Sequence, residues 1–203
     1  VTVEVTSTGG STARGTLAIT GETTFTNSGG TDEAITCDDS ANAFTGSVTF
    51  ATVIGNAVTI VDTTSLDLVA LSAASLNVTA GGAVTDSGTL AITGATTISA
   101  SGQDITLSEA ASTFGTISLT GANVAVTEAG ATDLGASTVS GTFGVTSTGA
   151  ITDSGTLAIT GASTFTNSGG KGKTINLGDR RNIIKEHRTI TPTSARYATI
   201  ATT

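Results

Sequence analysis

The chain repeats itself, and this repetition restricts the fold more than any other feature of the sequence. The letters VTSTG occur at 5–9 and again at 145–149, and GTLAITG occurs at 15–21 and again at 155–161. Half of that spacing places ITCDDSANAF at 35–44 over ITLSEAASTF at 105–114. Self-similarity at a fixed spacing is the signature of a protein built from stacked structural repeats. The sequence therefore predicts a super-repeat of about 70 residues.

A finer spacing lies inside the super-repeat, marked by acidic residues that follow a short apolar–polar step. Successive members of this acidic ladder are spaced at intervals that predict a unit of about 23 residues, three to each super-repeat. The members are Asp39, Asp62, Asp86, Glu109, Glu128, Asp153 and Asp179. This length suits a coil of a parallel β-helix or a leucine-rich repeat. Because the regular leucine pattern and the Asn or Cys ladder of the latter are missing, we favour the β-helix.

Apolar residues alternate with polar residues inside each unit, which is the pattern of β-strands with one buried face. Leu90 and Ile92, then Ile98, then Ile105 and Leu107 mark three such strands. Clusters of Gly and Ser between them suit sharp corners. The pattern predicts an all-β fold, a parallel β-helix of seven to eight coils with three strands in each coil. Each coil buries its inner face only against its neighbours.

Composition supports a thin core filled by aliphatic side chains. The chain is 37% hydrophobic but only 3% aromatic, and it has no Trp or Met. The single cysteine, Cys37, excludes an intrachain disulfide bond and aligns with Leu107 and Leu177 in the two following super-repeats. We therefore expect Cys37 to point into the core as a small apolar side chain rather than to act as a nucleophile.

Charge divides the chain into an acidic body and a basic end. The net charge is −8, yet seven of the eight basic residues lie between Lys171 and the carboxyl end. An acidic body disfavours nucleic-acid binding, which relies on Lys and Arg. We assign the parallel β-helix repeats to 1–179 and a divergent, basic last coil or cap with its tail to 180–203. A short helix over 180–188, with Asp179 as its N-cap, is the competing interpretation of that end.

No motif assigns a catalytic, cofactor-binding or metal-binding residue. The acidic ladder is either a row of calcium ligands or a set of corner residues that bind their own backbone, and we favour the corners. The Thr-x-Thr segment TFT at 24–26 recurs only at 164–166, so we expect no stacked threonine array of the kind that binds ice. The carboxylate pairs Asp32–Glu33 and Asp38–Asp39 are adjacent, so in a strand their members point to opposite faces and suit sugar hydrolysis poorly.

A resemblance to a known family rests on the repeat phrases at 81–143, which read GGAVTDSGTLAITGATTISASGQDITLSEAASTFGTISLTGANVAVTEAGATDLGASTVSGTF. Over roughly residues 5–179 the chain is similar to the repeat region of very large bacterial surface proteins, the filamentous-haemagglutinin-like, two-partner-secreted adhesins. The resemblance implies a right-handed β-helix on the outside of a Gram-negative-type cell. The amino-terminal secretion domain of that family, with its Asn-Pro motif, does not occur in this sequence, and the basic end departs from the repeats.

These observations predict a non-enzymatic, secreted or surface-bound bacterial protein that acts as a rigid spacer or fibre in adhesion. Its partner would be a host or neighbouring-cell surface or a matrix component. A blunt rod end exposes unpaired strand edges, so an alternative is a self-assembling filament, sheath or surface-layer subunit that grows head to tail. A polysaccharide-active β-helical enzyme is a lower alternative. We expect no cofactor, and the sequence has no apolar stretch long enough to predict a membrane span.

Overall fold

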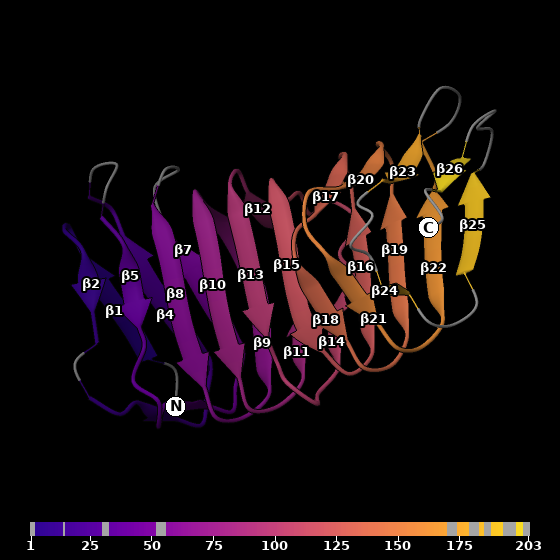
Figure 1. Cartoon of the computed structure of the whole chain (residues 1–203). Helices are drawn as coiled ribbons and strands as arrows, with labels where there is room; N and C mark the ends of the chain where they lie inside the picture. Colours follow the sequence, from indigo (N-terminus) through magenta and orange to yellow (C-terminus); the bar gives the residue numbers. More distant parts are fainter. Residues whose placement is uncertain are drawn as a thin grey trace.

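The computed structural model describes residues 3–13, 15–29, 33–51, 56–169 and 174–178, together with the backbone of three strands nearer the carboxyl end. These residues form a parallel β-solenoid of about eight turns, with about 20 residues in each turn. The turns stack along one axis, with β1 at one end and β25 at the other (Figure 1). The described residues contain no helix, so the predicted all-β parallel solenoid is confirmed.

Two parallel sheets run the length of the solenoid. Sheet A contains, from one end to the other, β1 (Val3–Ser7), β4 (Thr23–Asn27), β7 (Val48–Ala51), β9 (Leu66–Ala73), β11 (Val84–Asp86), β14 (Ile105–Leu107), β16 (Val124–Glu128), β19 (Phe143–Ser147), β22 (Ser163–Asn167) and β25 (Arg188–Pro192). Sheet B contains β2 (Ser11–Thr12), β5 (Ile35–Cys37), β8 (Ala57–Asp62), β10 (Ser75–Ala80), β13 (Ala95–Ser99), β15 (Thr116–Gly121), β17 (Thr132–Leu134), β20 (Ile151–Asp153), β23 (Ile175–Leu177) and β26 (Ala198–Ile200). Each strand therefore bonds to the strands one turn before and one turn after it.

A short third strand is present in only some of the turns, so the prediction of three short strands in every coil is only partly right. The third strands are β3 (Ala18–Ile19), β6 (Ala43–Phe44), β12 (Leu90–Ile92), β18 (Ser137–Val139), β21 (Leu157–Ile159) and β24 (Ile183–Ile184). The strand β3 pairs with β6, β12 pairs with the end of β9, and β18, β21 and β24 form a row beside sheet B. In the other turns the chain passes this side without a separate strand among the described residues.

The core is a narrow column of aliphatic side chains that follows from the alternation in the sequence. Leu90, Ile92, Ile98, Ile105 and Leu107 are all buried, as their spacing predicts. All six phenylalanines are also buried, and two of their contacts are edge-to-face. The inward positions stack on equivalent positions of the neighbouring turns, so each turn contributes a similar apolar layer.

The turn is shorter than predicted, about 20 residues rather than 23. The acidic ladder gave the wrong length because its members lie at the ends of strands in both sheets. From Asp39, after β5, to Asp153, in β20, the ladder has five intervals, whereas sheet B advances by six turns. Two of the intervals pass from one sheet to the other and therefore contain one and a half turns.

The super-repeat contains three and a half turns rather than three. The phrase VTDSGTLAITG at 84–94 forms β11 in sheet A and β12 beside it. The nearly identical phrase at 151–161 forms β20 in sheet B and β21 beside that sheet. The two copies have the same strand–corner–strand structure but lie in opposite sheets. A residue returns to the same sheet only after two super-repeats, which equal seven turns, as from β1 to β19 in sheet A.

The backbone at the basic end continues the two sheets. The strands β25 and β26 pair in parallel with β22 and β23, as a persistent last coil requires. Ile183–Ile184 form β24 and pair with β21, and Arg188 begins β25, so the described residues of 180–188 are in strands and not in the helix of the competing interpretation. The side chains of the proposed cap and tail at 180–203, with Asp179, lie outside the described residues.

Candidate functional site

The acidic ladder forms corners of the solenoid, and the first two members bind their own backbone as predicted. The Asp39 Oδ1 atom accepts a hydrogen bond from the Ala41 backbone N–H at 2.9 Å. Asp62 is buried, and its Oδ1 accepts hydrogen bonds from the Thr64 N–H at 2.9 Å and from the Phe44 N–H at 3.1 Å. The interpretation as turn residues is confirmed for Asp39 and Asp62, and Asp62 also links two turns.

Two further acids are buried between turns and act as ties rather than as a surface row. Glu128 accepts hydrogen bonds from the Phe114 backbone N–H at 2.9 Å and from the Thr132 hydroxyl at 2.6 Å. Asp86 accepts a hydrogen bond from the Ser108 backbone N–H at 2.6 Å. Burial raises the pKa of both carboxyls, because desolvation disfavours the charged form more strongly than these hydrogen bonds favour it.

The remaining members do not complete a single line of carboxylates. Glu109 follows β14 of sheet A and Asp153 ends β20 of sheet B, and both are half-buried. Asp179 lies outside the described residues. Within the ranges that the structure describes, no three His, Cys, Asp or Glu side chains are grouped closely enough to hold a metal ion.

Cys37 is buried in β5 and forms part of the core, as predicted from its alignment. Desolvation, with a smaller contribution from Asp38, raises the pKa of its thiol to about 11. A thiol with so high a pKa is protonated at neutral pH, which makes it a poor nucleophile. His187, the only histidine, lies outside the residues whose side chains the structure describes.

Single threonines stack in successive turns, although the Thr-x-Thr pair at 164–166 does not, since Thr164 lies opposite Gly144. Thr127, Thr146 and Thr166 occupy one register position in three neighbouring strands of sheet A. Each Thr-x-Thr segment recurs only after two super-repeats. Threonines from different segments nevertheless occupy the same register position in adjacent turns. On sheet B, a similar outward rank contains Thr59, Asn77, Thr97 and Ser118. The sides of the rod are therefore rich in hydroxyl groups.

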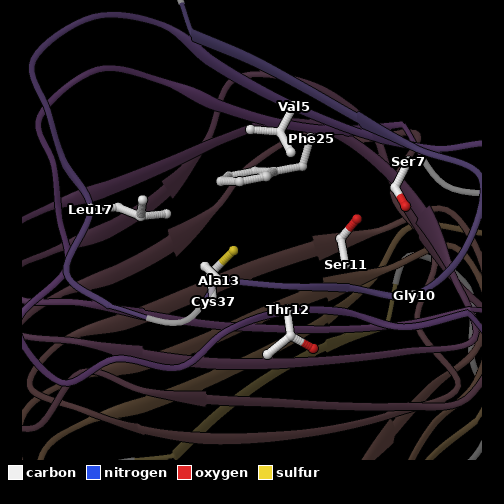
Figure 2. Close-up of a pocket in the computed structure, with 9 residues that line it drawn as sticks. All are labelled: Val5, Ser7, Gly10, Ser11, Thr12, Ala13, Leu17, Phe25 and Cys37. Carbon is white, nitrogen blue, oxygen red and sulfur yellow. The ribbon is translucent and has the colours of Figure 1, made fainter.

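The first turn contains an open hollow of about 430 Å³, shown in Figure 2. Its lining is mainly apolar and includes Val5 of β1, Leu17 just before β3, Phe25 of β4 and Cys37 of β5. Val5 is 39% exposed and is the most exposed large apolar side chain among the described residues. This hollow lies at the first turn of the core column that the structure describes. Its described lining contains no pair of titratable groups placed for proton transfer, so its geometry suits apolar contact rather than acid–base chemistry.

A second hollow, of about 340 Å³, lies on sheet A where the register between β7 and β9 shifts. Its lining residues are Thr49, Phe50, Ala51, Ala70, Leu71, Ser72, Thr89 and Ala91. None of them is titratable. The sequence analysis predicted neither hollow. A signal for the first one was present, because Val5 and Leu17 match the apolar residues Val145 and Leu157 of the later copy and therefore suit core positions.

Continuous parallel sheets around one apolar column, formed by a repeating sequence, define a β-solenoid repeat protein. The chain belongs to the family described as repeats of unknown function (DUF5649), which matches residues 1–51, 55–120 and 121–191. The second and third matched segments are each close in length to the predicted super-repeat. A search of curated proteins and a search of solved structures found no match. In the described part of the chain, no helix is long and apolar enough to cross a membrane.

Proposed function

We propose that this chain is a non-enzymatic, rigid spacer of a secreted or surface-bound bacterial protein, which holds an adhesive part away from the cell. One observation supports the proposal most: two sheets continue from the first turn to the last, so every added turn lengthens the rod by one strand spacing. A buried core column and buried ties such as Glu128 fasten neighbouring turns together. This construction gives stiffness and reach in one direction.

The resemblance to filamentous-haemagglutinin-like adhesins supports the extracellular and adhesive part of the proposal. The acidic body and the hydroxyl-rich sides suit a rod that stays soluble while it faces water. The partner, on this proposal, is a host or neighbouring-cell surface or a matrix component. The apolar hollow of the first turn and the corner roles of Asp39 and Asp62 support a non-enzymatic role.

The spacer function is tested by changing the number of turns. A second copy of residues 3–142, inserted between Thr142 and Phe143, adds seven turns in register. At about 4.8 Å for each turn, the rod should lengthen by about 34 Å. Small-angle X-ray scattering and electron microscopy would measure the longest dimension. A Gly/Ser insert of equal length is the control, because a flexible chain broadens the distribution of lengths instead. An unchanged longest dimension would contradict the proposal.

The non-enzymatic part needs a separate test. The chain would be incubated with acidic and neutral polysaccharides, and the release of new reducing or unsaturated sugar ends would be measured. We expect no turnover above that of a heat-denatured sample. Turnover that disappears when Asp38 and Asp39 are changed to Asn would contradict the spacer proposal and favour the enzyme.

A further inference from the structure

The outer surface of sheet B is flat and uncharged over four neighbouring strands in the middle of the rod, β8, β10, β13 and β15 (Figure 1). In each strand, outward positions alternate with buried core positions. Every outward residue of these strands is Ala, Ser, Thr, Val or Asn, so no side chain rises far above the sheet. Charged residues lie only beside it, with Asp38 directly after β5 and Asp133 in β17. We call the outward residues of these four strands the hydroxyl face.

Two ranks of side chains cross the hydroxyl face along the axis of the rod. The first rank consists of the register partners Thr59, Asn77, Thr97 and Ser118. The second rank lies two residues further along each strand and consists of Val61, Thr79, Ser99 and Thr120. All of these residues except Val61 carry a hydroxyl or an amide group. Recurrence of one Thr-x-Thr segment did not predict this array, because four different segments supply its strands.

The polar groups of the two ranks are available to a ligand. Within the described structure, none of their side chains makes a hydrogen bond to another group of the chain. Sheet A differs in the same part of the rod, because the hydroxyls of Thr85 and Ser87 donate hydrogen bonds to Asp67 at 3.2 and 2.8 Å. Asn77 and Thr97, near the centre of the hydroxyl face, are exposed. The two faces of the rod therefore differ both in charge and in free hydrogen-bonding groups.

The backbone holds the two ranks on a regular grid. Neighbouring strands lie about 4.8 Å apart, and two residues along a strand advance by about 6.6 Å. All four strands pair with a strand on each side, so the grid is rigid. The β-branched threonines are also restricted in their side-chain rotamers. A partner whose own atoms repeat at these two distances can thus bind every position at once, with little further loss of conformational entropy.

Charge, composition and area restrict the partner. A neutral face on a chain of net charge −8 is a poor site for ions or for charged polymers. None of its residues is aromatic, whereas neutral sugars usually stack on aromatic rings. The four strands cover about 400 Å², about half of the 800 Å² or so that each partner buries in a stable protein complex. A solid lattice of water remains, since it is neutral, needs both donors and acceptors, and has oxygen rows at spacings close to those of the two ranks.

We propose that the hydroxyl face binds ice. Water molecules held by the hydroxyls and lying between the methyl groups of the two ranks join the crystal lattice and anchor the rod to the ice surface. Ice then grows only between adsorbed rods, where its front becomes curved, and curvature lowers the freezing temperature. The proposal is separate from the spacer function, which needs no contact with ice.

The opposite side of the rod contains a less complete array. On sheet A, Thr127, Thr146 and Thr166 form one rank, but Gly144 interrupts the rank beside it. A single rank matches a lattice in one direction only, so we expect this side to bind ice weakly. The exposed Thr164 on this side corresponds in the repeat to the exposed Thr97 of the hydroxyl face, which provides a matched pair of positions.

The first test freezes a dilute solution of the chain slowly and measures the protein in the ice and in the remaining liquid. We expect the chain to be enriched in the ice relative to an inert globular protein of similar mass in the same solution. It should also slow the recrystallisation of small ice grains, which is followed by microscopy. Exclusion of the chain from ice to the same extent as the inert protein would overturn the proposal.

The second test compares variants at the matched positions. Thr97→Tyr places a ring above the flat hydroxyl face and should lower the enrichment in ice by about tenfold or more, because the positions of an array bind together. Thr164→Tyr, on the opposite side, should leave the enrichment unchanged. Both side chains point away from the core, and thermal melts followed by circular dichroism would show that both variants are folded.

Other results would overturn the proposal. Equal enrichment of Thr97→Tyr and the unaltered chain would place the ice contact elsewhere on the rod, and an equal loss in both variants would show that the contact does not depend on the hydroxyl face. Binding to microcrystalline cellulose or chitin above the freezing point, lost in Thr97→Tyr and without enrichment in ice, would assign the face to a neutral sugar polymer instead.

Discussion

Residues 3–29 and 143–169 have similar sequences and form corresponding strands in sheet A, but in the part of the chain that the structure describes only the second copy has a turn on both sides. The corners are alike: Ser7 accepts a hydrogen bond from the Gly9 N–H at 3.1 Å, and Ser147 accepts one from the Gly149 N–H at 3.2 Å. The burial differs, since Val5 is 39% exposed and Val145 only 1%. Local sequence therefore sets the corner, whereas the neighbouring turn sets the burial.

The largest difference between the copies should come from removing one core leucine. Leu157 is fully buried, so Leu157→Ala should lower the free energy of unfolding by about 2–5 kcal/mol. Leu17 is already partly exposed, and Leu17→Ala should cost about 1 kcal/mol or less. Urea denaturation followed by circular dichroism would compare the midpoints. Equal losses would mean that the first turn is covered in solution.

A close backbone contact at one glycine gives the second comparison. A Cβ atom at Gly149 would lie 2.5 Å from the Ala131 backbone nitrogen in the preceding turn, whereas at Gly9 the nearest atom is a side-chain oxygen 3.7 Å away. Gly149→Ala should force the two turns apart at a cost of about 1–3 kcal/mol. Gly9→Ala should change the denaturation midpoint very little. A similar loss in both variants would show that the corner conformation, rather than the neighbouring turn, requires glycine.

The third prediction concerns pH and the turn that covers the second copy. The folded pKa of Glu128 lies above the ordinary 4.5, so the folded chain binds more protons than the unfolded chain between these two values. The contribution of Glu128 to the free energy of unfolding should therefore fall as pH rises through this window. Glu128→Gln should flatten this dependence, while Thr106→Val, at an exposed position of β14 that does not titrate, should leave it unchanged. Thermal melts from pH 4 to pH 8 would measure the dependence, and a pH profile that Glu128→Gln leaves unchanged would contradict the prediction.

The last prediction compares how fast a disulfide reagent modifies two thiols of the first turn, and we expect the buried Cys37 beside the hollow to react slowly. Its thiol is buried and its pKa is about 11, so a disulfide reagent should react slowly at pH 8 and faster as pH approaches that value. Val5→Cys in a Cys37→Ser chain should react quickly because this position is exposed. Absorbance of the released thiol would give both rates. Equal rates would show that the first turn opens readily.

Features that depend on a few adjacent residues could be predicted from the sequence. Alternation placed Ile105 and Leu107 in the core, and the repeat alignment placed Cys37 in an equivalent core position, because inward and outward positions are fixed within one strand. The length of a turn could not be read from the acidic ladder, because acids that occupy similar corners belong to two different sheets. The exposed first turn could not be predicted either, because Val5 and Val145 have the same local sequence and differ only in what lies next to them.

The super-repeat contains three and a half turns, so successive super-repeats place the same residues on opposite sides of the rod. Any surface pattern carried by the super-repeat points to one side in one unit and to the opposite side in the next, as the phrases at 84–94 and 151–161 do. Copies that face the same way are seven turns apart, about 34 Å at the usual strand spacing. A flat partner on one side would therefore meet every second unit, and the units between would be free to engage a partner on the other side. One repeating unit therefore gives two opposite sides of the rod the same surface pattern, without a second kind of module.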